Sequence, residues 1–165
     1  MIIAVIAKPI VCWLYVDPLS SSSYLVVVLS KCPCSPVRVA YLQFAPEYLE
    51  VDQNLATVES LLRPANADLV VLPELFTSGY FFRSKEDLEQ VAEPIPEGTS
   101  VRALQSWSEQ FGATLVAGLP ERDGANLYNS AVVVRPSGRV DTYRKVHLFY
   151  EETTVFAPGD LGFQV

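Results

Sequence analysis

Two charged side chains stand directly beside apolar segments, where they could do chemistry. Glu74 follows the apolar run Leu69–Leu72, and Lys145 lies near the end of a segment whose neighbours are apolar. A carboxylate at the end of a buried strand is costly to bury without a partner, and the carboxyl ends of strands are where α/β sheets carry ligands. Glu74 is therefore a candidate functional residue, against the alternative of a loop carboxylate that turns outward. Lys145 is a second candidate, against the alternative of a solvated lysine on a sheet edge.

Three further polar residues follow Lys145 closely. The adjacent acids Glu151 and Glu152 are typical of a solvated loop, although one of them could pair with Lys145. His147, the only histidine, could act as a base, but we interpret it as a packed or hydrogen-bonded structural histidine. Ser78 lacks the flanking glycines of a nucleophile elbow, and the glycines are too scattered for a phosphate-binding loop. These residues offer acids and bases but no nucleophile.

The apolar pattern after the first 36 residues predicts alternating strands and helices. The run Val37–Phe44 predicts a buried strand, and the short run Leu69–Leu72 predicts a strand buried on both faces. A helix capped by Asp52 or Asn54 and ending near Arg63 joins them into a strand–helix–strand unit. The other predicted elements are a short helix over Glu86–Ala92, a helix from Thr99 or Ser100 to Phe111 that stops at Gly112, strands over Thr114–Gly118, Leu127–Arg135 and Arg139–Val146, and a loop-like tail over Phe149–Val165. The helix residues predicted to face inward are Leu55, Val58, Leu61 and Leu62, then Val101, Leu104, Trp107 and Phe111. The predicted fold class is α/β.

Composition limits the class of protein. The chain has 165 residues, half of them apolar, with a net charge of −7 and a pI of about 4.7. This mixture is typical of one globular domain, and the absence of a basic stripe excludes a nucleic-acid partner. We expect a soluble, cytoplasmic protein. Three cysteines, all within the first 34 residues, and one histidine predict neither a disulfide framework nor a structural zinc site.

The first 36 residues differ from the rest of the chain. They carry only three charges and two apolar runs, Met1–Val16 and Tyr24–Leu29, of which the second is too short to span a bilayer. A signal or anchor is one interpretation, but the start is not basic and Lys8–Pro9 interrupts the first run. We favour the hypothesis that this apolar extension is foreign to the domain. The domain would then begin near Val37, from a non-ATG codon or after a misjoined upstream frame.

Four short motifs resemble those of the nitrilase, or carbon–nitrogen hydrolase, superfamily. Leu72–Tyr80 (LPELFTSGY) is similar to the first signature of that family, and Tyr143–Phe149 (YRKVHLF) is similar to the second. Asn129–Ala131 is similar to the family's Asn-Ser/Thr-Ala element, and Phe156–Asp160 resembles the Pro-Gly motif that follows the second signature. The four occur in family order within residues 37–165, which makes the set specific. The resemblance does not extend to residues 1–36.

The resemblance implies a hydrolase in which a glutamate, a lysine and a cysteine act together. Glu74 would be the general base, Lys145 would stabilise the oxyanion, and Glu152 would position the substrate and the lysine. Tyr80 would line the substrate pocket. The implied substrates are small non-peptide amides, N-carbamoyl compounds or nitriles, without a metal or cofactor, and the phrase Leu148–Glu152 favours the amidase and N-carbamoyl branches. The implied fold is an αββα sandwich that forms homo-oligomers, of which this chain would supply roughly the first half.

The sequence departs from the family's pattern at the nucleophile. The family's cysteine follows the Pro-Gly motif, whereas Cys12, Cys32 and Cys34 precede the first family strand and the sequence ends at Val165. We therefore expect these residues alone to be inactive. We also expect them to be poorly soluble, with sheet edges and an apolar face uncovered. Two alternatives remain: a non-catalytic short protein that binds a small ligand or a partner subunit, and a membrane-linked acyltransferase relative with residues 1–36 as a degraded anchor.

Overall fold

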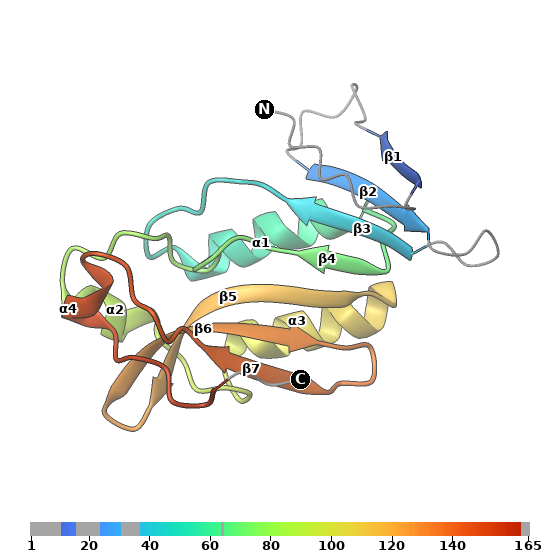
Figure 1. The fold of residues 1–165 in the computed structure, drawn as a ribbon. Helices are drawn as coiled ribbons and strands as arrows, with labels where there is room; N and C mark the ends of the chain where they lie inside the picture. The colour runs from blue at the N-terminus through green and yellow to red at the C-terminus, as the bar shows by residue number, and fades with distance from the viewer. Residues whose placement is uncertain (1–10, 16–23, 31–36, 64, 163–165) are drawn as a thin grey trace.

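The computed structural model describes residues 11–15, 24–30, 37–63 and 65–162, and Figure 1 shows them as one sheet with helices. The described strands follow one another across the sheet in chain order. The central strands β3, β4 and β5 are parallel, and the pairs on either side are antiparallel. The strands are β1 (Val11–Tyr15), β2 (Tyr24–Ser30), β3 (Val37–Leu42), β4 (Leu69–Val71), β5 (Thr114–Asp123), β6 (Asn126–Val134) and β7 (Val140–Arg144). This mixed sheet confirms the predicted α/β class.

The predicted strand–helix–strand unit is present as β3, α1 (Val51–Leu62) and β4. Parallel pairing of β3 with β4 requires such a crossover, and α1 supplies it. All four α1 residues predicted to face inward are buried. The prediction that β4 is buried on both faces is wrong among the described residues. Val70 is buried, whereas Leu69 and Val71 on the other face are only partly buried.

The predicted cap of α1 is wrong. The position before the helix is Glu50, and its side chain makes no capping hydrogen bond. Asn54 is buried, and its amide nitrogen donates to the carbonyls of Glu47 (2.7 Å) and Thr77 (2.9 Å). Its amide oxygen accepts from the Glu47 backbone N–H at 2.8 Å. The side chain that looked like a cap therefore joins two loops to the helix.

The second long helix, α3 (Thr99–Phe111), receives its cap from outside the helix. The predicted caps, Thr99 and Ser100, are helical residues, and the Glu93 carboxylate instead accepts from the backbone N–H groups of Ser100 and Val101. Gly112 ends α3 in the left-handed conformation, as predicted. The predicted short helix is α2 (Lys85–Val91), which Ser84 caps through the Asp87 N–H.

β5 is longer than the predicted strand Thr114–Gly118, whereas β7 is shorter than the predicted strand Arg139–Val146. β5 continues past Gly118 because nine successive residues pair with β6, out to Asp123 opposite Asn126. The tail predicted as a loop contains one short helix, α4 (Glu152–Val155).

The long helices cover one face of the sheet and leave the other open, as Figure 1 shows. Side chains alternate between the faces of a strand, so Ala40, Leu115 and Val132 are buried with α1 and α3 in one apolar core. On the opposite face, Tyr41 is 41% exposed and Val116 is only partly buried. No described helix covers this face, and no helix among the described residues is long and apolar enough to cross a membrane.

The apolar extension contributes two strands to the edge of the sheet. β2 pairs antiparallel with β3, and β1 pairs with β2. The rest of residues 1–36, including Cys32 and Cys34, lies outside the described residues. The origin of this segment, as foreign to the domain or as a degraded anchor, stays a prediction.

Candidate active site

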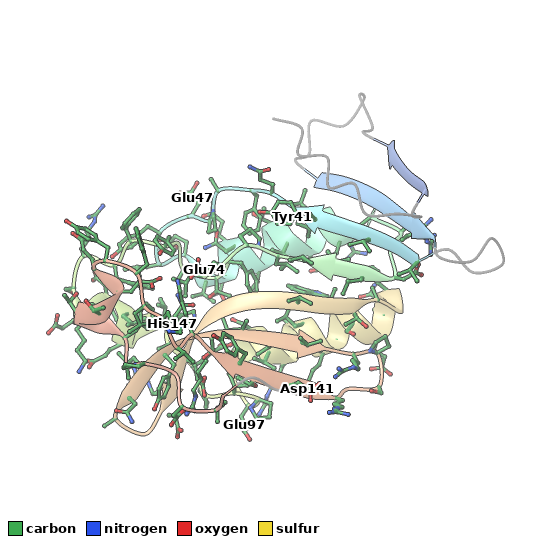
Figure 2. All side chains as sticks on the ribbon, in the orientation of Figure 1. Tyr41, Glu47, Glu74, Glu97, Asp141 and His147 are labelled. Atoms are coloured by element: carbon green, nitrogen blue, oxygen red, sulfur yellow. The ribbon has the colours of Figure 1, made fainter. Side chains whose placement is uncertain are left out.

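Three of the predicted site residues lie together at one edge of the sheet. Glu74 follows β4, Lys145 follows β7, and Glu152 begins α4. β4 and β7 run in the same direction, so their carboxyl ends share this edge. Lys145 Nζ donates to Glu74 Oε1 and to Glu152 Oε1, each at 2.8 Å. One ammonium therefore bridges two carboxylates, and Figure 2 labels Glu74, which contributes one of them.

The turn that carries Glu74 is held against β5. The N–H of Leu72 donates to the Val116 carbonyl at 2.8 Å, and the N–H of Phe76 donates to the Gly118 carbonyl at 2.9 Å. A Cβ at Gly118 would lie 2.8 Å from Glu74 Cα, closer than real Cβ contacts occur. Gly118 therefore sets how closely Glu74 approaches the sheet, a role that sequence reasoning missed.

Lys145 is fixed through its backbone on both sides. Its N–H donates to the Asn129 carbonyl at 2.8 Å, and its carbonyl accepts from the Gly159 N–H at 2.9 Å. Burial alone would lower the pKa of the ammonium. Hydrogen bonds to Glu152 and Glu74, with their negative charge, outweigh burial and raise the pKa above that of an ordinary lysine. Lys145 is therefore a fixed cation at neutral pH.

Glu152 is the most heavily bonded member of the site, and its side chain is only 6% exposed. Its Oε1 accepts from Lys145, from Asn129 Nδ2 at 3.1 Å and from the Tyr80 hydroxyl at 2.8 Å. Its Oε2 accepts from the Phe149 N–H at 2.6 Å. Burial would raise the pKa of Glu152, but these hydrogen bonds, led by Lys145, lower it below the usual value. Glu152 is therefore a permanent anion near neutral pH.

Tyr80 lies beside the carboxylates and keeps its proton. Burial, followed by the hydrogen bond to Glu152, raises the pKa of its hydroxyl. The hydroxyl therefore acts as a donor to Glu152, while the ring lies 6.0 Å from Lys145 Nζ. Tyr80 also lines a small hollow together with Phe82 and Phe149.

Asn129 is a site residue to which sequence reasoning gave no role. Its Nδ2 donates to Glu74 Oε1 at 2.7 Å and to Glu152 Oε1 at 3.1 Å, and the residue is only 4% exposed. The amide therefore separates and orients the two carboxylates. The available signal was the motif Asn129–Ala131, which marked the position without its contacts.

A groove of about 360 Å³ opens beside the cluster. Glu74, Asn129 and Lys145 form its polar wall, and Leu72 and Val116 contribute apolar surface. A concave site with few converging polar groups suits a small ligand.

Several other candidates lie outside this cluster. His147 is exposed in the loop after β7 (Figure 2), so it is not a packed histidine, and the alternative of a hydrogen-bonded histidine stays a prediction. Glu151 is exposed, as expected for a solvated acid, and the Ser78 hydroxyl is buried and donates to the Gly79 carbonyl. Cys12 lies on β1, at the opposite edge of the sheet from β7.

The fold and site define an α/β domain that carries an acid–base cluster at the carboxyl ends of its strands. The chain belongs to the carbon-nitrogen hydrolase family, whose model matches residues 38–165. The resemblance drawn from the four motifs is therefore confirmed, and the part of the family fold present here is the predicted nitrilase-like half.

Individual relatives agree with this assignment. A nitrilase from Pyrococcus abyssi (strain GE5 / Orsay) is 49% identical over 132 residues, covering 78% of this chain and 50% of that protein. An (R)-stereoselective amidase from a Pseudomonas species is 40% identical, over 75% of this chain and 45% of its own length. A carbon–nitrogen hydrolase superfamily protein from Xanthomonas campestris, solved with an arsenic adduct in its active site, superposes with a TM-score of 0.68 at 28% identity. That match covers 75% of this chain and 46% of the other. The chain spans about half the length of the curated relatives it matches.

Proposed function

We propose that the protein hydrolyses carbon–nitrogen bonds of small non-peptide amides, N-carbamoyl compounds or nitriles through a Glu-Lys-Cys mechanism. The observation that carries the proposal is the ammonium of Lys145 held 2.8 Å from both Glu74 and Glu152 beside a groove. Relatives named as a nitrilase, an (R)-stereoselective amidase and N-carbamoylputrescine amidases support the substrate range.

Glu74 is the general base of this proposal. Its side chain is 43% exposed, against 6% for Glu152, so it can meet a thiol and a water molecule. Its Oε1 accepts from Lys145 and Asn129. In this proposal its other oxygen, Oε2, accepts the proton. A cysteine thiol with a pKa near 8.5 is mostly protonated at pH 7, so a neighbouring base promotes the reactive thiolate.

The reaction is acyl transfer through sulfur. For an amide, Glu74 takes the thiol proton, the sulfur bonds to the carbonyl carbon, and the carbonyl electron pair moves to the oxygen, where Lys145 stabilises the negative charge. One such donor contributes about 3–4 kcal/mol to the transition state. Collapse breaks the C–N bond, and the amine leaves with the proton from Glu74. Glu74 then takes a proton from water, which attacks the thioester; the C–S bond breaks, the acid is released, and the proton on Glu74 returns to the departing thiolate.

The nucleophile of this proposal lies outside residues 1–165. None of the three cysteines matches the family motif, and Cys12 lies at the far edge of the sheet. These 165 residues alone are therefore predicted to be inactive. We propose that the complete enzyme is cytoplasmic and homo-oligomeric.

The test begins with the native gene downstream of codon 165. A frame that continues into a strand ending in a cysteine, followed by an aromatic residue and an acid, supports the proposal. In the complete protein, Glu74→Gln and Lys145→Ala should each reduce amide hydrolysis by at least about 100-fold. Glu151→Gln, an exposed acid in the same loop, should retain wild-type turnover. Full activity of either site variant would refute the assigned roles.

One observation favours a second function. The face of the sheet opposite the helices is partly apolar and carries no described helix, so it could pair with a partner subunit. A native stop codon after Val165, together with stable protein in cells, would favour this non-catalytic alternative.

A further inference from the structure

A second charged cluster lies on the reverse side of the strands that carry the site. Arg144 is buried, with 8% of its side chain exposed, and its guanidinium contacts three carboxylates. Its Nε donates to Glu121 Oε2 at 3.0 Å, Nη1 to Asp160 Oδ1 at 2.8 Å, and Nη2 to Asp123 Oδ2 at 2.8 Å. The Tyr128 ring lies 3.9 Å from the guanidinium carbon. One side chain therefore ties β5, β6, β7 and the segment after α4 together.

This Arg144 cluster and the candidate site occupy adjacent rungs of the β6–β7 ladder. Arg144 pairs with Ser130, whose hydroxyl hydrogen-bonds the same Glu121, while the next residue, Lys145, bonds to Asn129. Neighbouring residues of a strand point to opposite faces. Arg144 and Ser130 therefore lie behind the sheet at the level where Lys145 and Asn129 face the groove. A shift of this rung would move both site residues at once.

The Arg144 cluster also fixes residues 159–160, which lie beside the backbone of Lys145. Asp160 pairs with Arg144, and the neighbouring Gly159 N–H donates to the Lys145 carbonyl at 2.9 Å. A Cβ at Gly159 would overlap the Arg144 carbonyl, so the segment packs directly on the backbone of β7. The side chain and the main chain thus hold residues 159–160 against Arg144, which ends β7, and against Lys145, which follows it.

We propose that Arg144 is a positioning residue, which holds the Lys145 ammonium between its two carboxylates by locking the end of β7 to β5 and to Asp160. The planar fork of an arginine can meet three carboxylates at once, whereas a lysine presents a single charged nitrogen. Glu121 is 3% exposed, so its carboxylate holds the Arg144 guanidinium from a buried position on β5. The consequence for catalysis rests on the proposed function, but the positioning itself is a property of the fold.

The test measures Lys145 by competitive acetylation and mass spectrometry across pH. The sequence contains four lysines, and Lys85 on α2 is 54% exposed, so Lys85 provides an internal reference. In the wild type, Lys145 should react far more slowly than Lys85, because its pKa is raised and only 27% of its side chain is exposed. Arg144→Lys should raise the Lys145-to-Lys85 ratio by about tenfold for each unit by which the Lys145 pKa falls, and should shift the pH profile toward lower pH.

Two further variants keep the test decisive. Asp160→Asn removes only the exposed ion pair between Asp160 and Arg144, so it should raise the Lys145-to-Lys85 labelling ratio by a smaller factor than Arg144→Lys. This variant keeps the test possible if Arg144→Lys fails to fold. Arg139→Lys, an exposed arginine beside the start of β7, should leave the ratio unchanged. An unchanged ratio in folded Asp160→Asn and Arg144→Lys proteins would overturn the inference. Labelling needs no turnover, so a failure of the proposed function would appear separately, as normal hydrolysis by Lys145→Ala.

Discussion

Replacing Glu152 by glutamine removes one charge from the bridge while keeping its shape. Glu152 Oε1 lies 2.8 Å from Lys145 Nζ, a separation worth about 6 kcal/mol at an effective dielectric constant of about 20. Much of that attraction offsets the cost of burying the charges, and breaking a buried pair costs about 3–5 kcal/mol. Glu74 still pairs with Lys145, and the glutamine oxygen still accepts a hydrogen bond. We therefore expect the free energy of unfolding at pH 7 to fall by about 2 kcal/mol.

The pH dependence of stability gives a second, sharper signature of Glu152. Its pKa is lowered in the folded protein, so its contribution is fully present above the unfolded pKa of about 4.5 and is lost as pH falls through the folded value. Glu152→Gln should lack this part of the acid destabilisation. Urea unfolding, followed by the fluorescence of buried Trp107, measures both effects, with the exposed Glu151→Gln as the matched control. Equal stability of the two variants at pH 7, or an unchanged acid dependence in Glu152→Gln, would refute the reasoning.

Three further predictions follow from the packing around the site and the open face. Gly118→Ala places a methyl group 2.8 Å from Glu74 Cα, so we expect a loss of about 1–3 kcal/mol in urea unfolding and lower turnover in the complete enzyme. Asn129→Ala removes a donor that Glu74 and Glu152 share, and steady-state kinetics should show kcat reduced about tenfold with little change in KM. Residues 37–165 produced alone should sediment as aggregates, and Tyr41→Glu on the uncovered face should increase the soluble fraction.

The elements of the domain were largely predictable because the apolar periodicity is strong. The face of α1 that carries Leu55 and Val58, and the stop of α3 at Gly112, match the structure. The caps were not predictable, because tertiary contacts decided them. Asn54 bonds to two distant loops, and the carboxylate that caps α3 comes from Glu93. Local propensity cannot identify a partner that only the fold brings near.

The candidate site was predictable only in part, for the same reason. The positions of Glu74 and Lys145 beside apolar runs marked them as candidates, and family motifs added Glu152. Their mutual hydrogen bonds span 71 and 7 positions of sequence, so spacing alone could not reveal them. Asn129 and Gly118 act through contacts with Glu74, one through its amide and the other through its missing side chain. Residues of this kind become visible only when the strands are placed side by side.

Glu74 and Glu152 carry the same carboxylate group, but they differ in burial and in hydrogen bonding, which suits them to different roles. Glu152 is nearly buried and accepts four hydrogen bonds across its two oxygens, so protonating it would break a satisfied network. Glu74 is 43% exposed, and its Oε1 accepts hydrogen bonds from both Lys145 and Asn129. A general base must accept and release a proton in each catalytic cycle, whereas a residue that only positions Lys145 must stay charged. We therefore propose Glu74 as the proton carrier, and Glu152 as the fixed charge that keeps Lys145 in place when Glu74 accepts a proton.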